Sequence, residues 1–139
     1  MCNQVVVAGT LAALAEAIEL ADAAGLDTVQ VVRVLEGGLA SSAVLRAKQR
    51  NLVDHDHRPG GSLRNQVKDL DHALALAASV GAWTPQTTAA RATFGTALDA
   101  GMGDLDHSAV QEVLVPAGSS HRYGSITKAD GSANDSTNS

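Results

Sequence analysis

The residues best suited to metal chemistry are His55-Asp56-His57, where two imidazoles flank a carboxylate. Imidazole and carboxylate groups are common metal ligands, and a metal site usually collects three or four of them. The i, i+2 spacing falls in a polar stretch, VDHDHRPGGS, with no third or fourth ligand nearby in the sequence. We therefore predict a solvated loop here and no metal site.

Three other positions could bind small molecules. Lys68-Asp69 is a charged pair, which on a helix normally lies on a solvated surface. Gly38 and Ser41 belong to a turn, GGLASS, whose backbone N–H groups could hold an anion at a helix start, although a turn with a serine cap explains the same residues. Asn3 stands where an asparagine could cap a helix.

Cysteine content and charge exclude several classes of function. Cys2 is the single cysteine, which excludes an intrachain disulfide and a multi-cysteine metal site and fits a reducing cytoplasm. No basic neighbour or sequence-adjacent histidine would activate its thiol, so a catalytic cysteine is not expected. The net charge is -5 and the pI is near 5.4, and no basic stripe exists to neutralise the phosphates of a nucleic acid.

The chain is organised around the segment 3–25, which contains no proline and is rich in alanine and leucine. Its three charges, Glu16, Glu19 and Asp22, share one narrow stripe, and nearly all other positions are apolar or small. Such a pattern predicts a central helix buried on almost all sides and ended by Gly25. The glutamates in mid-segment and the lack of a basic region before it argue against a membrane span or a signal peptide.

The composition predicts an all-α fold, because the 45% of hydrophobic residues are mostly alanine, valine and leucine with one Trp, one Tyr and one Phe. One domain, residues 1–116, would hold further helices at 29–36, 43–52, 63–79, 85–100 and 109–115. Dense β-branched residues leave a strand as the alternative at 29–36, where the valines and Leu35 would face the core. Residues 117–139 are rich in Ser, Gly, Asn and Asp and predict a disordered tail.

Four segments in consistent order carry a resemblance to a known family. They are CNQ at residues 2–4, GLDTVQVVRVLEGGLASS at 25–42, PGGSLRNQVKDLDHALALA at 59–77 and LDHSAV at 105–110. Together they resemble the β-hydroxyacid dehydrogenases up to about residue 114. Within that family they are most similar to the tartronate semialdehyde (2-hydroxy-3-oxopropionate) reductases, followed by the 3-hydroxyisobutyrate dehydrogenases.

The resemblance implies a specific architecture and site. Enzymes of this family join an N-terminal Rossmann domain, which holds NAD or NADP, to a C-terminal helical bundle like that of 6-phosphogluconate dehydrogenase. This chain resembles only the helical domain, which in the family completes the active site and packs across subunits, so a homo-oligomer is expected. The matching motifs assign Asn3, with Gly38 and Ser41, to a small hydroxyacid substrate and Lys68 and Asp69 to the cofactor.

Three departures from the family pattern stand out. No GxGxxG fingerprint is present, so the Rossmann domain is missing from the resemblance. In the K-x-x-N pattern that contains Asn3, the catalytic lysine, which serves as general acid, would fall just before Met1. Gly61 stands where the family usually has a phenylalanine near the nicotinamide, which predicts a looser cofactor pocket.

The leading functional hypothesis is the C-terminal domain of a cytoplasmic enzyme that reduces 2-hydroxy-3-oxopropionate to glycerate with NAD(P)H. The chain alone would be inactive, because hydride transfer needs a positioned cofactor. The alternatives are a fragment of a 3-hydroxyisobutyrate dehydrogenase, and a non-catalytic helical dimerisation module or remnant left after loss of the Rossmann domain. No nucleic acid or membrane partner is expected.

Overall fold

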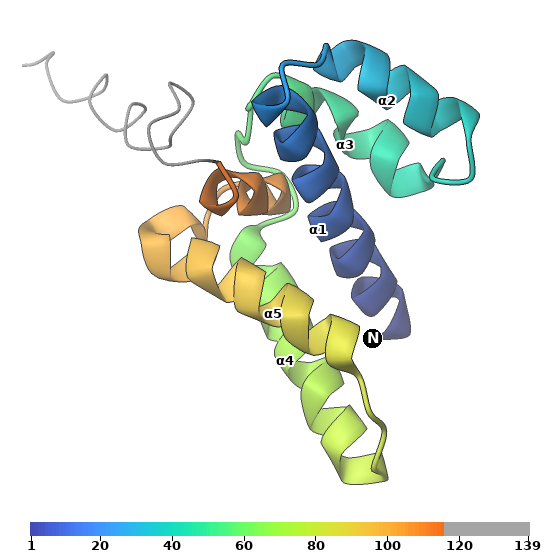
Figure 1. Ribbon diagram of the computed structural model, residues 1–139. Coiled ribbons are helices and arrows are strands. Elements are labelled where there is room, and N and C mark those ends of the chain that lie inside the picture. The colour runs from blue at the N-terminus through green and yellow to red at the C-terminus, as the bar shows by residue number, and fades with distance from the viewer. Residues whose placement is uncertain (116–139) are drawn as a thin grey trace, which may run out of the picture.

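The computed structural model describes residues 1–115, which fold into helices without a strand (Figure 1). In chain order they are α1 (Cys2–Ala23), α2 (Thr28–Gly37), α3 (Ala43–Val53), α4 (Leu63–Val80), α5 (Pro85–Ala97), the π-helical turn η1 (Leu98–Met102) and the 3-10 helix η2 (His107–Val113). The all-α prediction is confirmed, and the strand alternative at 29–36 is wrong. The predicted tail, 117–139, lies outside the described residues.

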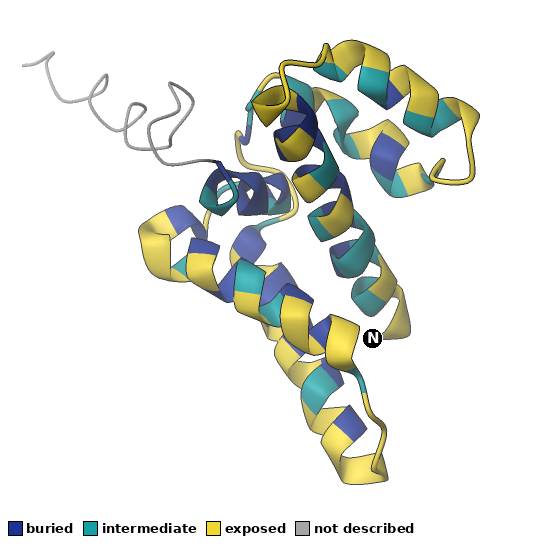
Figure 2. Ribbon diagram, in the orientation of Figure 1, coloured by how far each residue is buried: buried dark blue, intermediate teal, exposed yellow. Residues whose placement is uncertain are grey.

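The helix α1 is the centre of the bundle, because it contacts α2, α3, α4, α5 and η2 (Figure 1). Its buried side chains include Leu11, Leu14 and Ile18. The expectation of burial on almost all sides is wrong: Val6 is 65% and Leu20 72% exposed, because its neighbours leave part of the helix surface open (Figure 2). By length and composition alone α1 could cross a membrane, a test that core helices of soluble proteins also pass.

The helix ends follow the capping residues in the sequence. Gly25 adopts φ +73°, and the Leu26 N–H bonds to the Ala21 carbonyl at 2.9 Å in a Schellman motif. Asp27 caps α2 and Ser42 caps α3, each accepting a hydrogen bond from a backbone N–H. Gly81 ends α4 in the left-handed region. These short-range signals fix where the helices begin and end.

The core is built from leucines of several helices around the single phenylalanine, Phe94, which is fully buried. The prediction that the valines of 29–36 face the core is wrong for most of them. Of the α2 valines only Val32 is buried, while Val34 is 75% exposed, and Leu76 of α4 is also exposed. α2 lies at one side of the bundle and packs mainly on α1 and α3, so much of its surface stays open.

The chain changes character after α5. The predicted helix 85–100 ends earlier, at Ala97, and continues as η1, in which Gly101 adopts φ +87°. The predicted final helix is a 3-10 helix, with Asp106 accepting a hydrogen bond from the Ser108 N–H at 3.0 Å. An isolated bridge joins Ser62 to Asp106. It ties the start of α4 to the start of η2, next to the candidate site.

Candidate functional site

The N-terminal end of α1 meets the first half of α4 through side-chain hydrogen bonds. Gln4 Nε2 donates to Asp69 Oδ2 at 3.1 Å, although the two residues are 65 positions apart. Asn3 Nδ2 donates to Gln4 Oε1 at 3.2 Å, and Gln66 Nε2 donates to the Gln4 carbonyl at 3.4 Å. The structure therefore brings together Asn3 and Asp69, two of the predicted site residues.

His107 extends this polar cluster onto η2. Its Nδ1 lies 3.2 Å from Gln66 Oε1, and its backbone N–H donates to the Gly61 carbonyl at 2.7 Å. Burial lowers the pKa of His107, and because Gln66 Oε1 can only accept, Nδ1 is the donor in this hydrogen bond. A β-carbon at Gly61 would lie 3.9 Å from the imidazole. The space beside Gly61, where the family usually has a phenylalanine, thus borders on His107.

Lys68 is exposed and forms no hydrogen bond or ion pair with other residues in the range 1–115. Asp69 is half-buried and turned to Gln4. The Asp69 carboxylate therefore belongs to the polar cluster, and the Lys68 ammonium is available to a ligand.

Gly38 and Ser41 lie apart from this cluster, in the turn between α2 and α3. The turn faces the middle of α1 across a groove lined in part by Gly9, Ala13 and Ser41. The Ser41 N–H donates to the Gly38 carbonyl at 3.1 Å, and the Gly38 N–H donates to Leu35. Both N–H groups are therefore engaged within the turn, and the cap is made by Ser42, which accepts from the Leu45 N–H at 3.0 Å.

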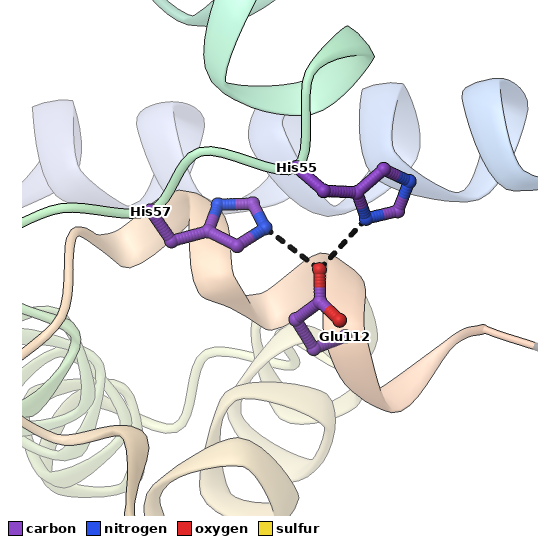
Figure 3. Close-up of side chains that lie close together, drawn as sticks. All are labelled: His55, His57 and Glu112. Carbon is purple, nitrogen blue, oxygen red and sulfur yellow. Dashed lines mark hydrogen bonds and ion pairs between the residues drawn. The ribbon is translucent and has the colours of Figure 1, made fainter. Parts of the chain in front are cut away.

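The prediction of a solvated loop at His55-Asp56-His57 is wrong for both histidines. His57 is only 5% exposed and His55 is half-buried. His55 Nδ1 lies 2.7 Å and His57 Nε2 2.9 Å from Glu112 Oε1 (Figure 3). The loop is held against η2 because the Asp106 N–H donates to the His57 carbonyl at 3.1 Å.

Burial and neighbouring charges shift the pKa values of these side chains. Burial alone would raise the pKa of Glu112, but hydrogen bonds with His55 and His57 lower it to about 2. The hydrogen bond to Glu112 raises the pKa of His55. Burial raises the pKa of Glu19, whose Oε1 lies 3.5 Å from His55 Nε2. The prediction of no metal site rested on the lack of a third potential ligand nearby in the sequence, and Glu112, 57 residues from His55, is such a group in space.

Sequence reasoning did not identify Gln66, His107 or Glu112 as site residues. Gln66 lies three positions before Asp69, so both share one face of α4, a spacing that could have been noticed. Glu112 has no such signal, because only the packing of η2 on the loop brings it to the histidines.

The comparisons with known proteins identify the family. A family profile described as NAD-binding of NADP-dependent 3-hydroxyisobutyrate dehydrogenase matches residues 1–114. The chain belongs to the β-hydroxyacid dehydrogenases. Escherichia coli K12 2-hydroxy-3-oxopropionate reductase is 34% identical to this β-hydroxyacid dehydrogenase chain over 114 residues, which cover 82% of this chain and 39% of the relative.

Solved structures of 3-hydroxyisobutyrate dehydrogenases have the same fold. The Salmonella typhimurium enzyme superposes with a TM-score of 0.77 at 28% identity, covering 81% of this β-hydroxyacid dehydrogenase chain and 39% of that one. The Mycobacterium tuberculosis enzyme gives a TM-score of 0.74 at 29% identity, covering 81% and 41%. The chain therefore spans about two fifths of these relatives. The family uses NAD(P).

Proposed function

We propose that this chain is the helical domain that completes the active site of an NAD(P)-dependent reductase acting on 2-hydroxy-3-oxopropionate. The observation that carries the proposal is the contact between Gln4 and Asp69. It joins Asn3, in the motif that the resemblance assigns to the substrate, to the Lys68-Asp69 motif assigned to the cofactor. The similarity of residues 1–114 to the family, including the 2-hydroxy-3-oxopropionate reductase of Escherichia coli, supports the substrate class.

The residues at this end of the bundle fit a cofactor that carries phosphates. The exposed Lys68 ammonium has no ion-pair partner within residues 1–115, so it can contact a negatively charged cofactor. Asp69 is fixed by Gln4 and is not turned toward Lys68 as a competing ion pair. When bound, NAD(P)H supplies the hydride. The described residues orient the substrate: Asn3 presents an amide to the hydroxyacid, and hydrogen bonds to Gln4 fix the positions of Asn3 and Asp69 relative to each other.

A second candidate function, dimerisation without catalysis, is supported by an apolar groove beside the N-terminal end of α1. The groove is lined by Val5 and Val6 of α1, Leu76 and Val80 of α4 and the start of α5. Val6 and Val80 are each about two thirds exposed, so this surface would gain from being covered. A second copy of the chain is the partner that the family resemblance suggests. Light scattering would show a dimer, and Val6→Glu would convert it to a monomer.

The experiment that tests the reductase proposal joins this chain to the Rossmann domain and lysine of the Escherichia coli relative, replacing the relative's own helical domain. NAD(P)H oxidation with 2-hydroxy-3-oxopropionate is measured for the fusion and for the chain alone. The expected result is turnover by the fusion only. A folded fusion that does not reduce 2-hydroxy-3-oxopropionate and does not oxidise 3-hydroxyisobutyrate with NAD(P)⁺ would contradict the proposal.

A further inference from the structure

Three donor atoms converge at the packing contact between the α3–α4 loop and η2. His55 Nδ1, His57 Nε2 and a carboxylate oxygen of Glu112 all lie within 4.8 Å of one another (Figure 3). Bonds of about 2.0–2.1 Å from a tetrahedral Zn²⁺ to nitrogen and oxygen place the ligand atoms roughly 3.3 Å apart. The two nitrogen-to-oxygen distances are 2.7 and 2.9 Å, so a small opening of the cluster would admit an ion.

The second ring nitrogen of each histidine already has a polar neighbour. His57 Nδ1 lies 2.8 Å from Ser108 Oγ, and His55 Nε2 lies 3.5 Å from Glu19 Oε1. Histidines that bind metals usually donate their other N–H to a carboxylate or another acceptor, which fixes the orientation of the ring. Both rings are thus oriented in the way that a metal site requires, with the remaining nitrogens aimed at Glu112.

The charges of the cluster match a divalent cation. Glu19 and Glu112 are both buried, and a buried carboxylate needs a compensating positive charge. A divalent ion between the two imidazoles and Glu112 would supply that positive charge.

Two local features accompany this cluster. Glu112 Oε2 is buried and has no hydrogen-bond partner among residues 1–115, which is costly for a carboxylate oxygen. His55 adopts φ +50° at the end of α3, where the Asp56 N–H bonds to the Asn51 carbonyl at 3.0 Å in a Schellman motif. Glycine usually takes this left-handed position. An imidazole here accepts backbone strain and points at Glu112.

We propose that His55, His57 and Glu112 bind one divalent transition-metal ion, Zn²⁺ being the best match to a His₂Glu donor set. Three protein ligands leave one position for water. The ion would join the α3–α4 loop to η2, away from the Gln4–Asp69 contact, so the proposal does not depend on the proposed reductase function. Buried oxygen-rich sites for Mg²⁺ or Ca²⁺ would need more carboxylates and carbonyls than converge here.

The test uses the full 139-residue chain without a histidine tag. The chain is titrated with ZnCl₂ by calorimetry, and Co²⁺ serves as a spectroscopic reporter of the ligand set. His55→Asn keeps a residue that tolerates the left-handed backbone, and Glu112→Gln keeps the side-chain shape. The expected result is one Zn²⁺ per wild-type chain and at least about 100-fold weaker Zn²⁺ binding in both variants. Removing a group that only supports a ligand lowers metal affinity by about 10–100-fold, so removing a ligand should lower it at least as much.

Two controls separate this site from adventitious binding. His72 is an exposed histidine of α4 outside the cluster, and Cys2 is an exposed thiol. His72→Asn and Cys2→Ser should bind Zn²⁺ like the wild type. No binding to the wild type, or binding that survives both cluster substitutions, would overturn the proposal.

X-ray absorption of the zinc-loaded wild type keeps the proposal testable if the cluster variants do not fold. Two imidazoles and an oxygen shell are expected, because the site contains no sulfur ligand. A sulfur shell, or fewer than two imidazoles, would place the ion elsewhere and overturn the assignment.

Discussion

The ion pair between Lys48 and Asp106 connects α3 to the start of η2, and its two partners should not be equivalent. Lys48 Nζ lies 2.7 Å from Asp106 Oδ2, and the side chains are 19% and 3% exposed. Lys48→Met leaves a buried carboxylate without its cation, which should lower the free energy of unfolding by about 3 kcal/mol. Asp106→Asn keeps the cap on the Ser108 N–H and leaves a lysine that can reach water, so about 1.5 kcal/mol is expected.

Urea unfolding followed by far-UV circular dichroism at pH 7 measures both losses. The matched control is Lys68→Met, which removes an exposed lysine without an ion-pair partner in the range 1–115 and should change stability by less than about 0.5 kcal/mol. The double variant Lys48→Met/Asp106→Asn should be more stable than Lys48→Met, because the uncompensated charge is gone. Equal stability of Lys48→Met and wild type would refute the reasoning.

The same pair predicts a pH dependence with a definite sign. Burial alone would raise the pKa of Asp106, but hydrogen bonds from Lys48 and Ser108 outweigh it and lower that pKa below the ordinary value of 3.8. A lowered folded-state pKa stabilises the protein fully above the unfolded value and loses this effect as the pH falls through the folded value. The gap between wild type and Lys48→Met should therefore shrink below about pH 3.8. A gap independent of pH would mean that the carboxylate charge is not involved.

Three further substitutions test the packing. Gly60→Ala should lower the free energy of unfolding by about 2 kcal/mol, because the new β-carbon would collide with the Asp106 carboxylate. In the control Gly37→Ala the new β-carbon would have nothing within 4 Å, so urea unfolding should show almost no change in stability. Phe94→Ala should cost about 3–5 kcal/mol, since Phe94 is fully buried, and a loss under 1 kcal/mol would contradict its place in the core. Gly25→Ala should cost about 1 kcal/mol at φ +73°, measured as a lower melting temperature.

Local signals were sufficient to predict the helices. Gly25 ends α1 as predicted, and Asp27, Ser42 and Gly81 likewise cap or end their helices, because capping depends on residues within one turn. Which face of a helix is buried was harder. Val34 and Leu76 are exposed because no other described element covers them, and hydrophobicity alone does not reveal how many neighbours a helix has.

The two polar clusters also differ in how much of each the sequence indicated. The motif with Asn3, Lys68 and Asp69 is visible in the sequence through the family resemblance, but the Gln4–Asp69 contact requires α1 and α4 to pack side by side. The burial of His57 was missed because its partner Glu112 lies 55 residues away. A polar stretch with a proline and glycines has the composition of a solvated loop, and only tertiary packing shows otherwise.

The measurement that tests the central claim most directly is kcat/KM for 2-hydroxy-3-oxopropionate in the fusion with the Escherichia coli Rossmann domain, comparing Asn3→Ala with Gln30→Ala. Gln30 is an exposed glutamine of α2, remote from the Gln4–Asp69 contact, and its removal should leave kcat/KM unchanged. Asn3→Ala should lower kcat/KM by roughly 100-fold, because misplacing a substrate by about 1 Å costs that much. Equal activity of the two variants would contradict the assignment of this end of the bundle to the substrate.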